Sequence, residues 1–190
     1  MTTQAAVQEA KVVLNGLDVG EVEALVAAIE DDPDLAKSRF RLHNTWIDGG
    51  HNRSRIEGFY SAQQEIAHQQ AFTLDADEPP ILGGQDRGAN PVEHLLNALA
   101  ACLTTTLVYH AAIRGIEIRS IESTVEGDLD LRGFLGLSGD VRRGYQNIRV
   151  KFSIDTDAEN LDRLKALSKL SPVFDVTSNG TDVEVSIERT

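Results

Sequence analysis

The sequence predicts an α+β fold in which antiparallel sheets accompany one long, apolar helix. Runs of residues with two-residue periodicity, typical of strands, lie on both sides of a segment with helical apolar spacing. Because the strands come in runs and do not alternate strictly with helices, the pattern favours α+β over α/β. The 190 residues, 41% hydrophobic and 25% charged, suffice for one sizeable core.

The N-terminal part is expected to be a helical appendage over residues 1–38, followed by the main domain at 39–190. Residues 21–30 have apolar positions at helical spacing, and Pro33 disfavours a helical residue before it. The apolar positions are Val22, Leu25, Val26 and Ile29.

Strand periodicity begins at Arg39 and is interrupted by a turn at Asp48-Gly49-Gly50. The expected elements after the appendage are strands over 39–47, 54–60 and 66–74, a loop over 77–88, strands over 121–129 and 148–154, a helix over 157–170 and a strand over 181–188. Between the two middle strands, residues 132–146 contain four glycines and predict a long connection or flap.

The segment Asn90-Pro91-Val92-Glu93 predicts the start of the long helix. Asn90 suits the N-cap, Pro91 the first helical position, and Glu93 the capping-box partner of Asn90. The residues that follow are apolar on nearly all sides, so this helix is expected to be wrapped by a sheet or packed in a dimer. Gly115 suits its end.

Composition excludes several classes of function. The net charge of −12 disfavours nucleic acids and anionic membranes as partners. A single cysteine forms no internal disulfide, and the histidines lack metal-ligand spacing, so neither a metal nor a nucleotide cofactor is expected. No basic start followed by an apolar run and no membrane-length apolar stretch is seen, which predicts a soluble, cytoplasmic protein.

Cys102 is the candidate nucleophile, although a cysteine in an apolar helix is more often a buried small hydrophobe. Thr106 and Tyr109 place polar groups on its side of the helix, whereas His94 and His110 project about 80° away and Glu93 about 180° away. His94, His110 and Glu93 therefore do not reach the Cys102 thiol within their own helix. A guanidinium from Arg53 or Arg55 would favour a thiolate, unless both are simply solvated.

The segment 83–118 resembles the cysteine-helix signature of the OsmC/Ohr family. The matching residues are Asn90-Pro91, Glu93, Leu95-Leu96, Ala100-Ala101-Cys102-Leu103 and Gly115-Ile116. A looser resemblance in the order of elements covers residues 39–188 and leaves out 1–38. It implies an intertwined homodimer, with the long helices between two sheets, and reduction of organic hydroperoxides by a thiolate. In these terms Cys102 is the attacking thiol, Arg53 its cationic partner and Glu93 an orienting carboxylate.

The chain departs from this family pattern at three positions. Ser171, followed by Pro172-Val173, stands where the resolving cysteine is expected, so an external thiol would have to resolve the oxidised Cys102. His51 stands where some members have arginine, and Glu93 comes one residue later than in peroxidatic members. The alternatives are a non-enzymatic dimer that binds a small apolar molecule beside an inactive thiol, and a structural dimer joined through residues 1–38.

Overall fold

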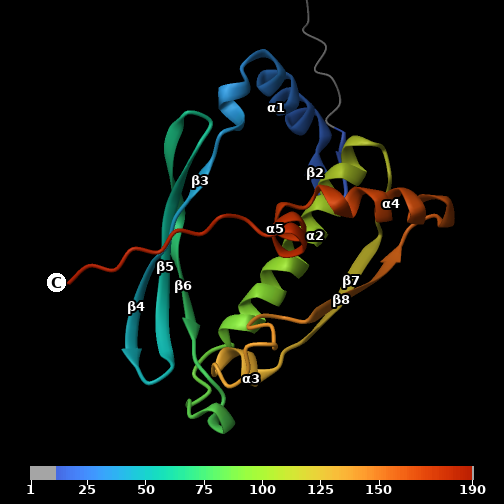
Figure 1. Ribbon diagram of the computed structural model, residues 1–190. Coiled ribbons are helices and arrows are strands. Elements are labelled where there is room, and N and C mark those ends of the chain that lie inside the picture. Colours follow the sequence, from blue (N-terminus) through green and yellow to red (C-terminus); the bar gives the residue numbers. More distant parts are fainter. Residues whose placement is uncertain (1–11, 190) are drawn as a thin grey trace, which may run out of the picture. The chain divides into compact units, whose positions relative to one another are not determined.

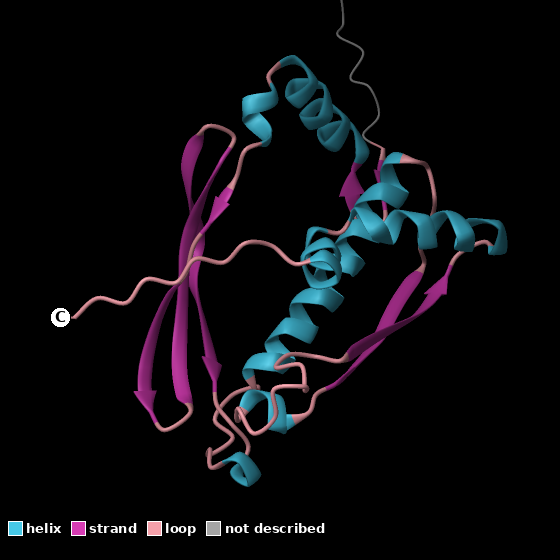
Figure 2. Cartoon of the chain, viewed as in Figure 1, coloured by secondary structure: helices cyan, strands magenta, loops and turns pink. Residues whose placement is uncertain are grey.

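The computed structural model describes residues 12–189 and confirms the α+β class (Figures 1 and 2). The chain falls into two compact units, the first ending at Glu93 and the second beginning at His94, and each is described by itself. The division into 1–38 and 39–190 stays a prediction. The strands are β1 (Val13–Leu14), β2 (Leu17–Asp18), β3 (Arg39–Phe40), β4 (His43–Asp48), β5 (His51–Ser61), β6 (Gln64–Ala76), β7 (Ser120–Asp128) and β8 (Asn147–Asp155). The α-helices are α1 (Val19–Asp31), α2 (Pro91–Ile113), α3 (Leu131–Phe134), α4 (Leu161–Leu167) and α5 (Pro172–Asn179).

A four-stranded antiparallel sheet forms most of the first unit. β5 pairs with β3 and β4 along one side and with β6 along the other. The β5–β6 register shifts between Ile56 and Gly58, where the backbones approach closely. A Cβ atom at Gly58 would lie 2.4 Å from the carbonyl oxygen of Ile66, so only glycine fits this irregularity.

The N-terminal region begins with a hairpin that the sequence analysis missed. β1 and β2 are joined by Asn15-Gly16, whose φ angles of 54° and 80° suit a two-residue hairpin turn. Asn-Gly is the strongest short hairpin signal, so the sequence did contain the information. α1 follows where a helix was expected, and the Asp18 carboxylate caps it by accepting from the Glu21 N–H at 3.3 Å.

The second unit has its core around α2. The buried side chains of this core are Leu107, Ala111, Ile116, Leu164 and Leu167, with Ile121, Phe152 and Ile154 of the β7–β8 hairpin packed against them. By length and mean hydropathy α2 is the one helix among residues 12–189 that could span a membrane. A helix at the centre of a core has the same composition, and α2 buries Leu99, Leu103 and Leu107 in this way.

Two predicted elements after β8 need correction. The helix expected over 157–170 is divided into 3₁₀ turns at Ala158–Asn160 and Ser168–Leu170 around α4, and α5 was not predicted. The strand expected over 181–188 is wrong, because this segment forms no strand in the described chain. Its alternating apolar side chains, including Val183 and Ile187, are 79% and 93% exposed. A strand needs a hydrogen-bonded neighbour, and these residues have none in the described sheets.

The glycine-rich connection between β7 and β8 is folded back on itself. Asp130 caps α3 by accepting from the Arg132 N–H at 3.0 Å, and Leu137 N–H donates to the Arg132 carbonyl oxygen at 2.9 Å. Gly133 is buried against the backbone of Arg142, where a Cβ atom would lie 2.4 Å from the carbonyl oxygen. The sequence predicted a flap here but not its closed neck.

Candidate functional site

The start of α2 forms the expected capping box. The Asn90 side-chain oxygen accepts from the Val92 N–H at 3.0 Å, and the Glu93 carboxylate accepts from the Asn90 N–H at 2.8 Å. The Asn90 amide also donates to the Glu78 carboxylate. Glu93 is therefore engaged in fixing the beginning of the cysteine helix, and any effect it has on the thiol is one of positioning.

Cys102 lies near the middle of α2 and is half-buried. Its neighbours Ala98, Ala101 and Thr105 on that side of the helix are exposed in the single chain. The buried leucines Leu99, Leu103 and Leu107, which hold α2 in the core, project between about 60° and 140° round the helix from Cys102. Within the single chain the Cys102 thiol is therefore partly accessible to solvent.

Arg53 lies on β5 in the first unit and binds a carboxylate. Its Nε donates to Asp75 Oδ1 at 2.9 Å, and His51 Nε2 lies 2.7 Å from the same oxygen. These partners, His51 first and Arg53 second, lower the pKa of Asp75 below its usual value of 3.8. The proposed approach of Arg53 to Cys102 joins the two units and stays a prediction.

His51 is a central member of this cluster that sequence reasoning noted only as a departure. It is 7% exposed, and Arg87 Nη1 lies 3.3 Å from its Nδ1. Because arginine can only donate, Nδ1 accepts, and Nε2 carries the hydrogen that is donated to Asp75. Arg87 also binds Asp48 at 2.7 Å. The cluster thus ties β4, β5 and β6 to the loop that leads into α2.

Asp77 holds the same loop from inside. It is 2% exposed, and its carboxylate accepts the backbone N–H groups of Glu78, Gln85 and Arg87 at 2.8 to 3.2 Å. Burial raises the pKa of Asp77, but these backbone hydrogen bonds outweigh it and lower the pKa below 3.8. The sequence showed only a glycine- and proline-rich loop here, because hydrogen bonds between distant residues leave no local pattern.

The Asp75 interactions predict a pH-dependent contribution to stability. Since the folded pKa lies below the usual one, the contribution is complete above about pH 4 and is lost as the pH falls below that value. Asp75→Asn should lower the urea midpoint at pH 7 and have less effect at pH 3. The fluorescence of Trp46, the only tryptophan and part of β4, reports on this sheet. An equal difference at both pH values, or the same pattern for Glu122→Gln, would contradict the assignment.

Ser171, at the position of the expected resolving cysteine, is fully buried and caps α5. Its Oγ accepts from the Phe174 N–H at 3.2 Å, and its carbonyl oxygen accepts from Asp175 N–H at 2.9 Å. The side chain therefore has a structural role that does not require a thiol.

Ser171→Ala is expected to destabilise the second unit by about 1–2 kcal/mol, because the partly buried Phe174 N–H group loses its partner. Urea unfolding followed by circular dichroism measures this loss, with the exposed Ser153→Ala as control. Unchanged stability would show that water satisfies the cap equally well.

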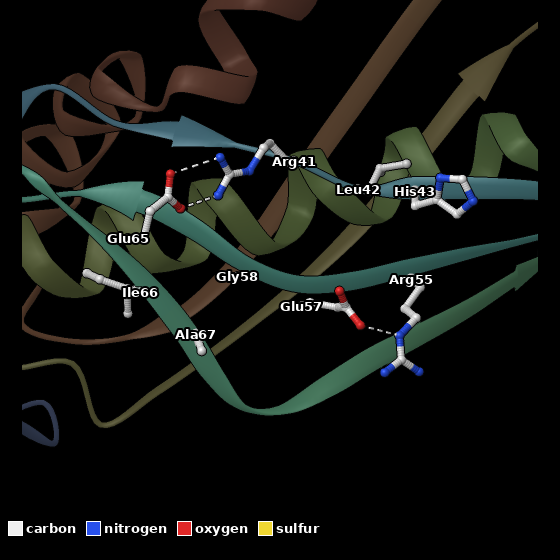
Figure 3. A pocket seen from close by; sticks show the side chains of 9 residues that line it. All are labelled: Arg41, Leu42, His43, Arg55, Glu57, Gly58, Glu65, Ile66 and Ala67. Carbon is white, nitrogen blue, oxygen red and sulfur yellow. Dashed lines mark hydrogen bonds and ion pairs between the residues drawn. The ribbon is translucent and has the colours of Figure 1, made fainter.

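The cavities of the two units differ in character. In the first unit a hollow of about 670 Å³ lies over the β5–β6 irregularity, where Arg41 pairs with Glu65 and Arg55 with Glu57 (Figure 3). Its charged groups thus satisfy one another. In the second unit an apolar cavity of about 480 Å³ lies between α2, β8 and α4. Among residues 12–189 no group of three or more His, Cys, Asp or Glu side chains could hold a metal ion.

By its fold the chain is an α+β protein that carries its single cysteine on a long core helix. Residues 83–186 match the family described as OsmC-like protein, which is more than half of the chain. The chain therefore belongs to the OsmC-like protein family, and α2 is the core helix of a soluble OsmC-like fold. The resemblance to the OsmC/Ohr family that the cysteine-helix motif indicated is thus confirmed. A comparison with curated proteins finds no match.

Solved structures show the same fold at low sequence identity. An OsmC-like protein from Mycoplasma pneumoniae is 19% identical, with a TM-score of 0.55 over 74% of this chain and 88% of that one. An organic hydroperoxide resistance protein OsmC from Legionella pneumophila is 16% identical, with a TM-score of 0.50 over 76% and 94%. An OsmC-like protein of unknown function from Vibrio cholerae is 11% identical, with a TM-score of 0.55 over 72% and 92%.

Proposed function

We propose that this protein is a cytoplasmic, thiol-dependent reductase of organic hydroperoxides that uses Cys102 alone. The observation that carries the proposal is a half-buried cysteine on the core helix of a family whose members include organic hydroperoxide resistance proteins. The capping role of Ser171 agrees with a cycle in which no second cysteine takes part.

The proposed cycle consumes two equivalents of an external thiol. The Cys102 thiolate attacks the terminal oxygen of the hydroperoxide, the O–O bond breaks, and the alkoxide takes a proton and leaves as an alcohol. Cys102 is then a sulfenic acid. One thiol condenses with it and releases water, and a second thiol reduces the mixed disulfide. Arg53 would favour the thiolate, and Glu93 would position the helix.

We further propose that the working form is a homodimer. Over 181–188, exposed apolar residues alternate with polar ones, as in a strand that lacks a neighbour. On α2, an exposed stripe contains Ala98, Ala101 and Thr105. Both features are those of surfaces that another chain covers. Sedimentation equilibrium of the full chain should give twice the mass of 20.7 kDa. A chain that ends at residue 180 should shift toward monomer, and a full-length monomer would overturn the dimer.

The activity is tested with cumene hydroperoxide and dithiothreitol. The full chain should consume the peroxide catalytically, and one equivalent of peroxide without thiol should add one oxygen atom to Cys102, which dimedone then traps. Intact-protein mass spectrometry measures both products. Peroxide consumption no faster than with dithiothreitol alone, together with an unmodified Cys102, would overturn the proposal.

The alternative function is binding of a small apolar molecule without catalysis. The apolar cavity of the second unit favours it, because side chains such as Leu103, Phe152 and Phe174 line a volume suited to a small ligand. Under this alternative a fluorescent fatty-acid probe binds equally well to the full chain and to Cys102→Ser, and Cys102 reacts with iodoacetamide no faster than a free cysteine. Fast alkylation and absence of probe binding would exclude it.

A further inference from the structure

An acidic, apolar surface lies on the N-terminal helix. This acidic helix surface comprises residues 18–34, which include no lysine or arginine. Its acidic residues are Asp18, Glu21, Glu23, Glu30, Asp31, Asp32 and Asp34. α1 buries none of its residues, and Leu25 and Val26 are 55% and 42% exposed. Glu23 and Glu30 are seven residues apart, so they lie within about 20° of each other around the helix, beside Val26.

A basic, apolar surface lies on the folded-back connection of the second unit. This basic loop surface comprises residues 131–143, where Phe134 and Leu137 are 70% and 72% exposed. Arg142 and Arg143 are exposed, and neither forms an ion pair with any residue of the described chain. Asp140 is the one acidic residue of this surface, which therefore carries positive charge in a chain of net charge −12.

Backbone contacts close the neck of the basic loop surface. Its neck is closed where Gly133 meets the backbone of Arg142, and hydrogen bonds from Leu135 N–H and Leu137 N–H continue the turn. A hollow of about 480 Å³ lies within the loop, beside Arg142 and Arg143. Exposed apolar side chains beside unpaired arginines are typical of an interaction surface.

We propose that the acidic helix surface of one copy docks on the basic loop surface of a second copy, so that a dimer contains the contact twice. The inference rests on the homodimer of the proposed function. Leu25 and Val26 pack on the exposed apolar side chains of the loop, while Glu23 and Glu30 face Arg142 and Arg143. The N-terminal helix then has a role in assembly, although it lies outside the segment 83–186 that matches the family.

A second copy fits better than other occupants. An anionic membrane would attract the loop but repel residues 18–34 and the chain as a whole. A basic peptide would suit the helix and leave the loop uncovered. A second copy satisfies both surfaces at once, because each chain carries the two complementary halves.

The test exchanges charges between the two surfaces in the full chain. The loop variant is Arg142→Glu/Arg143→Glu, and the helix variant is Glu23→Arg/Glu30→Arg. Each variant alone brings like charges together in its own dimer, and the dimer Kd should rise about tenfold or more. In an equal mixture both contacts of a mixed dimer are attractive again. Native mass spectrometry, with one variant isotope-labelled, should therefore show mixed dimers well above the statistical share.

Controls distinguish the contact from the dimer itself. Lys169→Glu and Glu159→Arg reverse exposed charges elsewhere and should leave the Kd within about twofold. If the wild type is dimeric and both variants dimerise with the same Kd, the proposed contact between helix and loop is wrong, and the proposed homodimer is retained. If the variants weaken the dimer but mix only statistically, the helix and loop do not meet between copies. A monomeric wild type would overturn the dimer and, with it, this contact.

Discussion

Cys102→Ser is expected to reduce thiol-dependent consumption of cumene hydroperoxide at least about 100-fold, to the rate of the uncatalysed reaction. A hydroxyl group at this position is protonated at neutral pH and is not an effective nucleophile towards peroxide oxygen. Serine has nearly the size of cysteine, and Cys102 is only half-buried, so the fold should survive the change. The assay follows peroxide loss under saturating dithiothreitol, and circular dichroism checks that the variant is folded.

Ser153→Ala serves as the control, because it alters an exposed hydroxyl residue of β8 without removing the thiol. It should retain activity within about twofold. Equal rates for wild type and Cys102→Ser would show that another group consumes the peroxide or that the protein does not catalyse this reaction.

Leu164→Ala is expected to have the largest effect on stability, about 2–5 kcal/mol. Leu164 is 1% exposed and joins α4 to the core that contains Leu107 and Ile116. It also lines the apolar cavity of the second unit, so the space left by the truncated side chain would enlarge an existing void that the backbone does not close. Urea unfolding followed by circular dichroism measures the loss.

Leu161→Ala provides the comparison on the same helix. Leu161 lines the same cavity but is 49% exposed, so its truncation should cost less than about 1 kcal/mol. If both substitutions cost the same, burial within the described chain does not determine the stability of α4, and a partner chain must cover Leu161.

The elements that could be predicted from the sequence are those determined by local patterns. The capping box at Asn90 and Glu93 and the alternation in β7 and β8 are properties of neighbouring residues, and the structure has them where they were expected. The family motif around Cys102 was likewise readable, since its residues are contiguous along one helix.

The parts that could not be predicted depend on residues distant in sequence. Asp75, His51 and Arg87 form one cluster, yet no spacing rule connects positions on two strands and a loop. The expected strand over 181–188 has the right alternation but lacks a partner in the described sheets, so the local pattern alone did not produce a strand. The predicted role of Arg53 beside Cys102 is of the same kind, since the two residues lie on different elements, β5 and α2.

At the closed neck, backbone contacts determine the form of the basic loop surface, and exposed side chains determine its chemistry. The backbone of residue 142, and not its side chain, meets Gly133. The arginine there can be exchanged for other side chains while the path of the chain is retained, whereas any Cβ atom at position 133 would force the neck apart. Substitutions at Arg142 should therefore change the charge of the basic loop surface without changing its backbone, whereas a substitution at Gly133 should change the backbone itself.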